Sequence, residues 1–533
     1  RWYIIRRYLM LAFRPLSPMA HFLLQAFTQK EPAPQDEAKI TVNPIVSKFA
    51  SWYERLRNAM EFREDEVVLR ATIERILKRR LLLGGNGQTT GLHLVKELLW
   101  ARYLPNHEIA ESVVKRVEES IDLYLALRFK VMEQHKISDQ VMNDWIYDLM
   151  SSDIQYILNP KYKKEVMTNF MFYVLKDDVT ITDDAQETKD AQVFMAVRKA
   201  FAKDDLAFLR YHLFSQYFGK LTPETLEYTA ANFLKGYEEI LNELNYPLKD
   251  RIYSYVKRRS AVFFILEDIL ESHKENLKTL LENEGELEKA VFHATQIRYN
   301  SIASKVKRAI IRSVFFILLT KVGFAFAVEG TYERFVYGHI MWPSLILNIV
   351  IPPILMVIVG FMIRTPGDDN TKMILGYINQ LLHEENPQLG NRLITVKVQK
   401  SSKILAFIFN LLWLIAFVIS FGGIILILTQ LDFNPVSQFI FTFFLAIVSF
   451  LAYRISLLAN IYRVGDKQGL LTLLSDFLFM PVIRVGRKLT QTVSQINIFL
   501  WLFDFIIETP FKLLFAFFDQ WFYYLRGKSE ELE

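Results

Sequence analysis

The hydrophobic and polar positions follow two different patterns along the chain, and the change between them lies near residue 305. Residues 46–304 place apolar side chains at three- and four-residue spacing between charged ones, as in SKFASWYERLRNAMEFREDEVVLRATIERILKRRLLL at 47–83. This spacing is typical of amphipathic helices. The remainder repeatedly supplies long apolar runs. The pattern therefore predicts an all-α protein, in which a large helical domain precedes a membrane-spanning helical region.

Four of the apolar runs are long enough to cross a bilayer, which takes about 20 residues of helix. The clearest, ILAFIFNLLWLIAFVISFGGIILILT at 404–429, contains no ionisable residue. The second carries Pro352 and Pro353 in its interior. We expect spans at about 309–328, 340–363, 404–429 and 436–453.

Composition divides the rest of the chain. Residues 28–45 combine proline and charge without periodicity, which is typical of a linker. We expect a helical cytoplasmic domain at 46–304, a transmembrane domain at 305–460 and membrane-associated amphipathic helices at 461–533. Alternating segments are scarce, and the best one, VTITDD at 179–184, is too short to predict a sheet.

The first 27 residues mix arginine with aromatic side chains, a composition that suits an interfacial anchor on anionic lipid. The alternative is a terminal helix packed on its own domain. The residues concerned are Arg1, Arg6, Arg7, Arg14, Trp2, Tyr3, Tyr8 and Phe13.

Residues 496–525 resemble an apolar helix with one narrow polar stripe. The stripe faces water if the helix lies in the membrane interface, or a polar lumen if the helix packs between subunits. Its members fall within an arc of about 80° at 100° per residue, and they are Asn497, Asp504, Glu508, Lys512, Asp519 and Arg526.

Basic residues are distributed unequally between the segments that connect the spans. Lysine and arginine concentrate before span one, between spans two and three, and after span four, whereas the two opposite connections contain only Arg334. Cytoplasmic connections carry the excess of positive charge in membrane proteins. We therefore expect a multi-pass protein with both termini in the cytoplasm, held in the cytoplasmic membrane if the source is bacterial.

Composition also excludes several classes of function. The chain has no cysteine, so disulfides, thiolate metal sites and cysteine nucleophiles are ruled out. The net charge of +5 is modest for 533 residues, and a nucleic-acid-binding protein would show a basic stripe. We expect no nucleic-acid partner.

Three short motifs invite a ligand, and each has a simpler interpretation. GGNGQTTG at 84–91 lacks the lysine of a phosphate-binding loop, so we interpret it as a turn between helices. His93 and Glu97 are one helical turn apart, but two ligands do not make a metal site. Gly367-Asp368-Asp369-Asn370 suggests a cation site, or a turn that starts the next helix. We expect no cofactor, no metal and no catalytic residue.

The candidate site lies inside the predicted spans. Lys321 is near the middle of span one, and an ionisable group at that depth is a functional hypothesis by default. Its possible partners are Glu329 and Glu333, or Asp504 and Glu508 if the C-terminal helix inserts; alternatively it snorkels or packs without meeting lipid. Asn348 beside the proline pair, and Asn410 in span three, are the other polar side chains at depth.

These features favour a non-enzymatic, membrane-anchored scaffold or assembly protein. Its helical domain would bind a protein partner or a second copy of the chain, while the spans and flanking helices contact lipid. A channel or transporter with a polar site around Lys321 is the alternative. A membrane-embedded enzyme is the third possibility, although spans three and four offer no acid, histidine or serine constellation.

Overall fold

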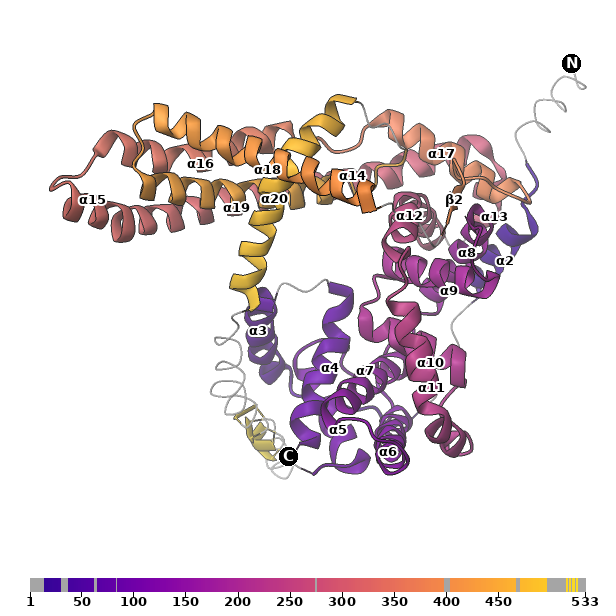
Figure 1. Cartoon of the computed structure of the whole chain (residues 1–533). Coiled ribbons are helices and arrows are strands. Elements are labelled where there is room, and N and C mark those ends of the chain that lie inside the picture. The colour runs from indigo at the N-terminus through magenta and orange to yellow at the C-terminus, as the bar shows by residue number, and fades with distance from the viewer. Residues whose placement is uncertain are drawn as a thin grey trace, which may run out of the picture. The chain divides into compact units, whose positions relative to one another are not determined.

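The fold is mostly helical, as the sequence pattern predicts (Figure 1). The computed structural model describes residues 14–29, 37–61, 65–82, 84–273, 276–396, 403–465 and 470–495, together with parts of 514–525. Within these ranges only two three-residue strands accompany the helices.

The chain forms two compact units. The helical unit comprises residues 21–260, 391–397 and 498–533, and the span unit comprises 1–20, 261–390 and 398–497. The division falls inside helix α12 (Lys249–Ser272), which continues from one range into the next. The sequence-based boundary at 304 was drawn from hydropathy, whereas the two units are divided by the compactness of the fold. The two criteria differ, so the predicted domain ranges remain a prediction.

The helical unit is built around one large apolar core. Its interior includes Leu94, Val117, Ile121, Leu149 and Phe233, all buried. The elements of this unit are α3 (Pro44–Glu61), α4 (Asp65–Leu81), α5 (Gly87–Trp100), α6 (Glu111–Gln134), α7 (Asp139–Leu158), α8 (Tyr162–Leu175), η1 (Lys176–Asp178), α9 (Gln186–Val197), η2 (Arg198–Ala202), α10 (Leu206–Phe218) and α11 (Leu226–Leu244).

A small parallel ladder also belongs to the helical unit. Strand β1 (Val179–Ile181) pairs with β2 (Leu393–Thr395), with Val179 opposite Leu393 and Ile181 opposite Thr395. The sequence-based view that 179–184 builds no sheet was therefore wrong. A strand this short is recognised by its partner, and that partner lies far along the chain.

The span unit contains the long apolar helices. Its elements are α13 (Leu277–Glu282), α14 (Glu284–Phe324), η3 (Ala325–Gly330), α15 (Thr331–Val336), α16 (Trp342–Met362), α17 (Asp368–His383), α18 (Lys403–Gln430), α19 (Pro435–Ala459) and α20 (Leu470–Gln495). Among the described residues, four helical stretches are long and apolar enough to cross a membrane: Glu284–Val336, Trp342–Met362, Phe407–Gln430 and Pro435–Ala459. They coincide with the four predicted spans, except that the first span is the end of a much longer helix.

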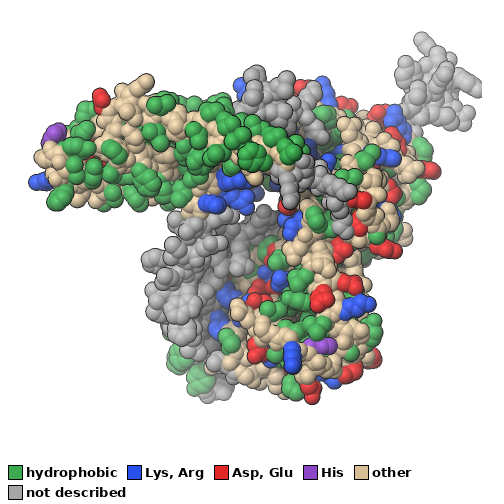
Figure 2. Space-filling view, in the orientation of Figure 1, with side chains coloured by type: hydrophobic (Ala, Val, Ile, Leu, Met, Phe, Trp, Pro, Cys, Tyr) green, Lys and Arg blue, Asp and Glu red, His purple; other side chains and the backbone are tan. Residues whose placement is uncertain are grey.

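The surface of these helices is apolar. On α18 large side chains such as Phe407, Phe409, Val418 and Leu426 are exposed around the helix, and Figure 2 shows hydrophobic side chains covering the spanning helices. Water would solvate such a surface poorly, whereas hydrocarbon matches it. The span unit is therefore that of a membrane protein.

Helix α20 continues through Pro481 and packs on two of the spans, α18 and α19. Gly486 allows a close approach, because a Cβ built there would overlap the carbonyl oxygen of Ala446 on α19. The Arg484 guanidinium lies 4.4 Å from the Trp413 ring centroid on α18. Residues 470–495 thus form part of the helix bundle of this unit.

The described part of the N-terminal segment packs on protein. Helix α2 (Pro18–Thr28) buries Leu23 and Phe27. Just before it, the Ser17 amide donates to the Leu382 carbonyl at 2.7 Å, and the Arg14 amide donates to the Glu282 carbonyl at 3.0 Å. The interfacial anchor predicted for residues 1–27 depends mainly on residues 1–13, which lie outside the described residues.

Candidate functional site

The first span changes its helical form where the candidate site lies. After Phe324 the α-helix gives way to the π-helical turns of η3 (Ala325–Gly330), followed by α15. A π-helical segment within an α-helix often marks a functional position, because it displaces the residues that follow. Here it turns Glu329 into the bundle, where the side chain is fully buried.

Glu329 is held by a side chain of the second span. Asn348 Nδ2 lies 2.7 Å from both carboxylate oxygens of Glu329 and 3.3 Å from the Ser437 carbonyl oxygen of α19. Pro352 has no N–H to donate to the carbonyl of Asn348. The proline therefore leaves the backbone carbonyl of Asn348 as a second polar group beside its side chain.

Glu333 joins the ends of three helices. Its carboxylate accepts hydrogen bonds from Asn434 Nδ2 and from the Met341 amide, both at 2.7 Å. Asn434 also caps α19 by accepting from the Ser437 amide at 2.8 Å. Glu333 is fully buried, so these donors replace the water that its carboxylate would otherwise bind.

Lys321 completes the group, which we call the intramembrane polar cluster (Lys321, Glu329, Glu333, Asn348 and Asn434). Its exposure is 0%, and its ammonium lies 4.7 Å from the centroid of the Phe444 ring on α19. Among the described residues its Nζ has no hydrogen-bond partner, although the Glu329 carboxylate interacts with it electrostatically.

The structure brings together some of the sequence-based candidates and separates others. Lys321 and Asn348 both interact with Glu329, one of the two acids expected near span one. Asn410 is exposed on α18, outside the cluster. Asp504, Glu508, Lys512 and Asp519, the candidate polar stripe, lie outside the described residues.

The cluster limits the chemistry that is possible. Two carboxylates and one ammonium are fully buried, so the group carries an excess negative charge when all three are ionised. It can hold the helices in register through hydrogen bonds, or accept a proton or a monovalent cation. Three buried ionisable groups in one four-helix bundle are costly enough to need such a role.

The three short motifs have structural roles. Asn86 caps α5 in a capping box with Thr89, and the Gly87 amide donates to Asp122 Oδ1 at 2.7 Å. Glu97 is paired with Arg79 and Arg80, while His93 is exposed.

The last motif starts α17 at Asp368. Its Asn370 side chain is buried and donates to Tyr299 Oη at 2.8 Å and to the Tyr462 carbonyl oxygen at 2.7 Å. It therefore ties α17 to neighbouring segments of the span unit.

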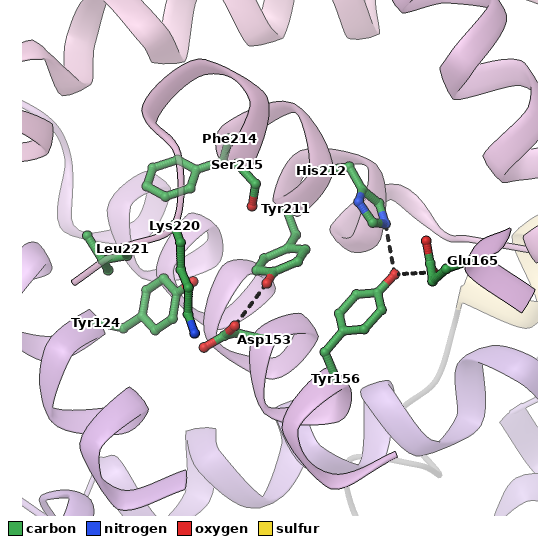
Figure 3. A pocket seen from close by; sticks show the side chains of 10 residues that line it. All are labelled: Tyr124, Asp153, Tyr156, Glu165, Tyr211, His212, Phe214, Ser215, Lys220 and Leu221. Atoms are coloured by element: carbon green, nitrogen blue, oxygen red, sulfur yellow. Dashed lines mark hydrogen bonds between the residues drawn. The ribbon is translucent and has the colours of Figure 1, made fainter. Parts of the chain in front are cut away.

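A second polar site, which the sequence did not reveal, lies in the helical unit (Figure 3). It is a cavity of about 330 Å³ between α6, α7, α8 and α10. Its floor carries Tyr211, whose hydroxyl donates to Asp153 Oδ1 at 2.9 Å. The lining residues are Tyr124, Asp153, Tyr156, Glu165, Tyr211, His212, Phe214, Ser215, Lys220 and Leu221.

One wall of this cavity is fixed by a buried arginine. Arg198 donates from Nε to Asp204 Oδ2 and from Nη1 to Glu165 Oε2, both at 2.5 Å, and from Nη2 to the Tyr156 hydroxyl at 2.7 Å. The Tyr156 hydroxyl lies 3.0 Å from His212 Nε2. We call these five residues the Arg198 network.

Burial and the arginine charge set the protonation states of the network. Burial alone would raise the pKa of Glu165 and of Asp204, but the hydrogen bonds and charge of Arg198 outweigh it and lower both pKa values. Burial lowers the pKa of His212. The carboxylates are therefore ionised and the imidazole neutral at pH 7.

The sequence gave little warning of this network. Its members come from α7, α8, α10 and the segment around η2, so no spacing links them. The one available signal is Arg198 itself, which interrupts the apolar run VFMAVRKAFA at 193–202.

Comparison with known proteins assigns no function to either site. No protein-family model matches the chain, and no curated protein or solved structure matches it significantly.

Replacing Arg198 by Met is expected to destabilise the helical unit by about 3–5 kcal/mol at pH 7, because two buried carboxylates lose their counter-charge. A lowered carboxyl pKa contributes stability above about pH 4 that is lost as the pH falls. The deficit of the variant should therefore shrink on acidification. Unfolding of the full chain in detergent at pH 7 and at pH 3, which is below the ordinary carboxyl pKa of about 4, measures this change.

The matched control is Arg251→Met, at an exposed arginine of α12, which should change stability little at either pH. A deficit for Arg198→Met that stays constant or grows as the pH falls would contradict the assigned protonation states.

Proposed function

We propose that the protein is a non-enzymatic, membrane-anchored scaffold or assembly protein. The four spans hold it in the bilayer, and the helical unit binds a partner protein. The observation that carries this proposal is an exposed apolar face on α3.

Helix α3 is apolar on two adjacent faces, which lie about 100° apart around the helix axis. Val46, Ala50 and Tyr53 are buried against the unit. Ile45, Phe49 and Trp52 are 51%, 63% and 61% exposed, respectively.

The spacing of the exposed face suits a helical partner. Residues at i, i+4 and i+7 lie in one row along a helix, and such a row differs from the scattered apolar residues of an ordinary surface. An amphipathic helix recognises its partner through anchors at this spacing. Lys48 and Arg55, also exposed, flank the row, so charge complementarity favours a partner helix with acidic residues beside its apolar face.

A photoreactive phenylalanine analogue placed at Trp52 tests this proposal in the full chain in native membranes. We expect a discrete protein adduct, weakened by Lys48→Glu with Arg55→Glu because the partner is acidic. The control position is Phe129, a 68% exposed aromatic on α6, which should give no adduct.

The outcomes separate the possible partners. An adduct of twice the chain mass would identify the partner as a second copy. Adducts only with lipid, or equal labelling at Phe129 and Trp52, would refute a protein-binding face on α3.

We also propose that both termini and the helical unit lie in the cytoplasm. The support is the basic-residue asymmetry of the connections between spans. Since the chain has no cysteine, single cysteines can be introduced as labelling sites. Leu431→Cys reports on the connection between spans three and four, and Glu385→Cys on the connection between spans two and three. An impermeant maleimide applied to intact cells should label Leu431→Cys alone, and labelling of both positions to the same extent would overturn this orientation.

A second function, ion or proton transport, is favoured by one specific observation. Lys321 is fully buried with no hydrogen-bond partner among the described residues, beside two buried carboxylates. In transporters, polar groups at broken helices line the binding site for a coupled ion. The π-helical turns of η3 interrupt the α-helix of the first span, and Pro352 and Pro353 lie inside α16, where each leaves a helical carbonyl without its backbone donor.

Lys321→Leu distinguishes the two functions. In an anchor it removes a burial cost of a few kcal/mol, so thermal stability in detergent should be unchanged or higher. If Lys321 compensates a working Glu329, the variant should lose about 3–5 kcal/mol and recover with Glu329→Gln.

Flux measurements complete that test. Proteoliposomes of a transporter would pass protons or monovalent cations, and Lys321→Leu would abolish this flux while the exposed control Arg312→Leu would not. The anchor proposal expects no flux from the unmodified protein, so measurable flux that depends on Lys321 would replace it with the second function.

A further inference from the structure

An open groove runs along the outside of the first two spans. It has a volume of about 700 Å³ and lies between α14 and α16. This volume falls within the range of about 300–1,000 Å³ found for small-molecule sites. Its lining residues are Ala303, Val306, Lys307, Ile310, Ile311, Val314, Phe315, Leu318, Val357, Gly360, Phe361, Ile363, Arg364 and Thr365.

The floor of the groove is formed where the two helices touch. Gly360 of α16 lies against Ile310 of α14, and a Cβ at Gly360 would come within 2.9 Å of the Ile310 side chain. Phe315 and Phe361 are among the exposed apolar side chains of the walls. The groove therefore presents hydrocarbon over most of its length.

The polar groups gather at one end of the groove. Lys307 precedes the apolar part of α14, and Arg364 and Thr365 follow the end of α16. Both cations are exposed, and neither forms an ion pair with a described residue. Two cations at the mouth of an apolar groove, with no ion-pair partner among the described residues, are complementary to an amphiphile with an anionic head.

The dimensions match one leaflet of a bilayer. From Lys307 to Leu318 a helix rises about 17 Å, and half of the hydrocarbon core is about 15 Å. A lipid whose head contacts Lys307 would therefore extend its acyl chain to the end of the groove. The basic end also belongs to the side that positive-charge counting assigns to the cytoplasm, where anionic lipids concentrate.

We propose that this groove binds one anionic glycerophospholipid, with the phosphate between Lys307 and Arg364 and an acyl chain along Ile311, Val314 and Leu318. The binding site is independent of the partner on α3 and of any transport through the bundle. The orientation of the first two spans would then depend on the lipid composition of one leaflet.

The test uses the full chain in detergent with phosphatidylglycerol or phosphatidylcholine of identical acyl chains, and native mass spectrometry to count bound lipid. We expect the unmodified protein to prefer phosphatidylglycerol by about 25-fold, since each of the two basic side chains near an anionic head contributes roughly fivefold. Lys307→Gln with Arg364→Gln should bring the ratio near one.

Matched variants keep the outcome interpretable. Lys305→Gln with Arg308→Gln removes the same charge from exposed positions outside the groove lining, and should keep the preference. Val314→Trp fills the groove and should reduce binding of both lipids. Phe361→Ala removes a wall residue that is 84% exposed and should also weaken binding of both lipids. This variant keeps the test valid if the tryptophan of Val314→Trp perturbs folding.

Three results would overturn the proposal. The first is equal binding of the two lipids by the unmodified protein. The second is an equal loss of preference in the two charge variants, which would indicate general surface attraction. The third is unchanged lipid binding in both Val314→Trp and Phe361→Ala.

Discussion

The constraint on which the span unit depends is that hydrocarbon offers no hydrogen-bond partner to a charged or polar group. Glu329 and Glu333 satisfy it with donors from other helices: Asn348 of α16, and Asn434 together with the Met341 amide. Removing any one of these helices would leave a carboxylate without its donor, at a cost of several kcal/mol. The cluster therefore specifies which helices associate and in which register, a role that apolar packing alone performs weakly in lipid.

The helical unit meets the same requirement with a different solution. There the buried charge is Arg198, and its guanidinium is matched by two carboxylates and a tyrosine hydroxyl. Both polar sites include π-helical turns: Glu329 lies within η3, and Arg198 is the first residue of η2. In each case a buried charged side chain coincides with a change in helical winding, which is common at functional positions.

Continuity of the helices links the two kinds of environment. Helix α14 begins at Glu284 among charged residues and ends at Phe324 within the apolar bundle. A helix that crosses from water into hydrocarbon needs no change of backbone hydrogen bonding, since all of its bonds lie within the segment. The lipid groove begins along this same helix, where Lys307 marks the transition from polar to apolar surface.

The sequence by itself determined the helical class and the four apolar helices, because both follow from local periodicity and from the length of apolar runs. It also singled out Lys321, Asn348 and the acids Glu329 and Glu333, because polar residues in an apolar run are visible without a structure. It missed the pairing of β1 with β2, and it did not detect the Arg198 network, whose members are distant in sequence. Only the tertiary structure decided that Asn410 faces outward while Asn348 meets Glu329. The direction in which a side chain points depends on helix rotation and packing, and these are set by contacts between segments that the order of residues does not display.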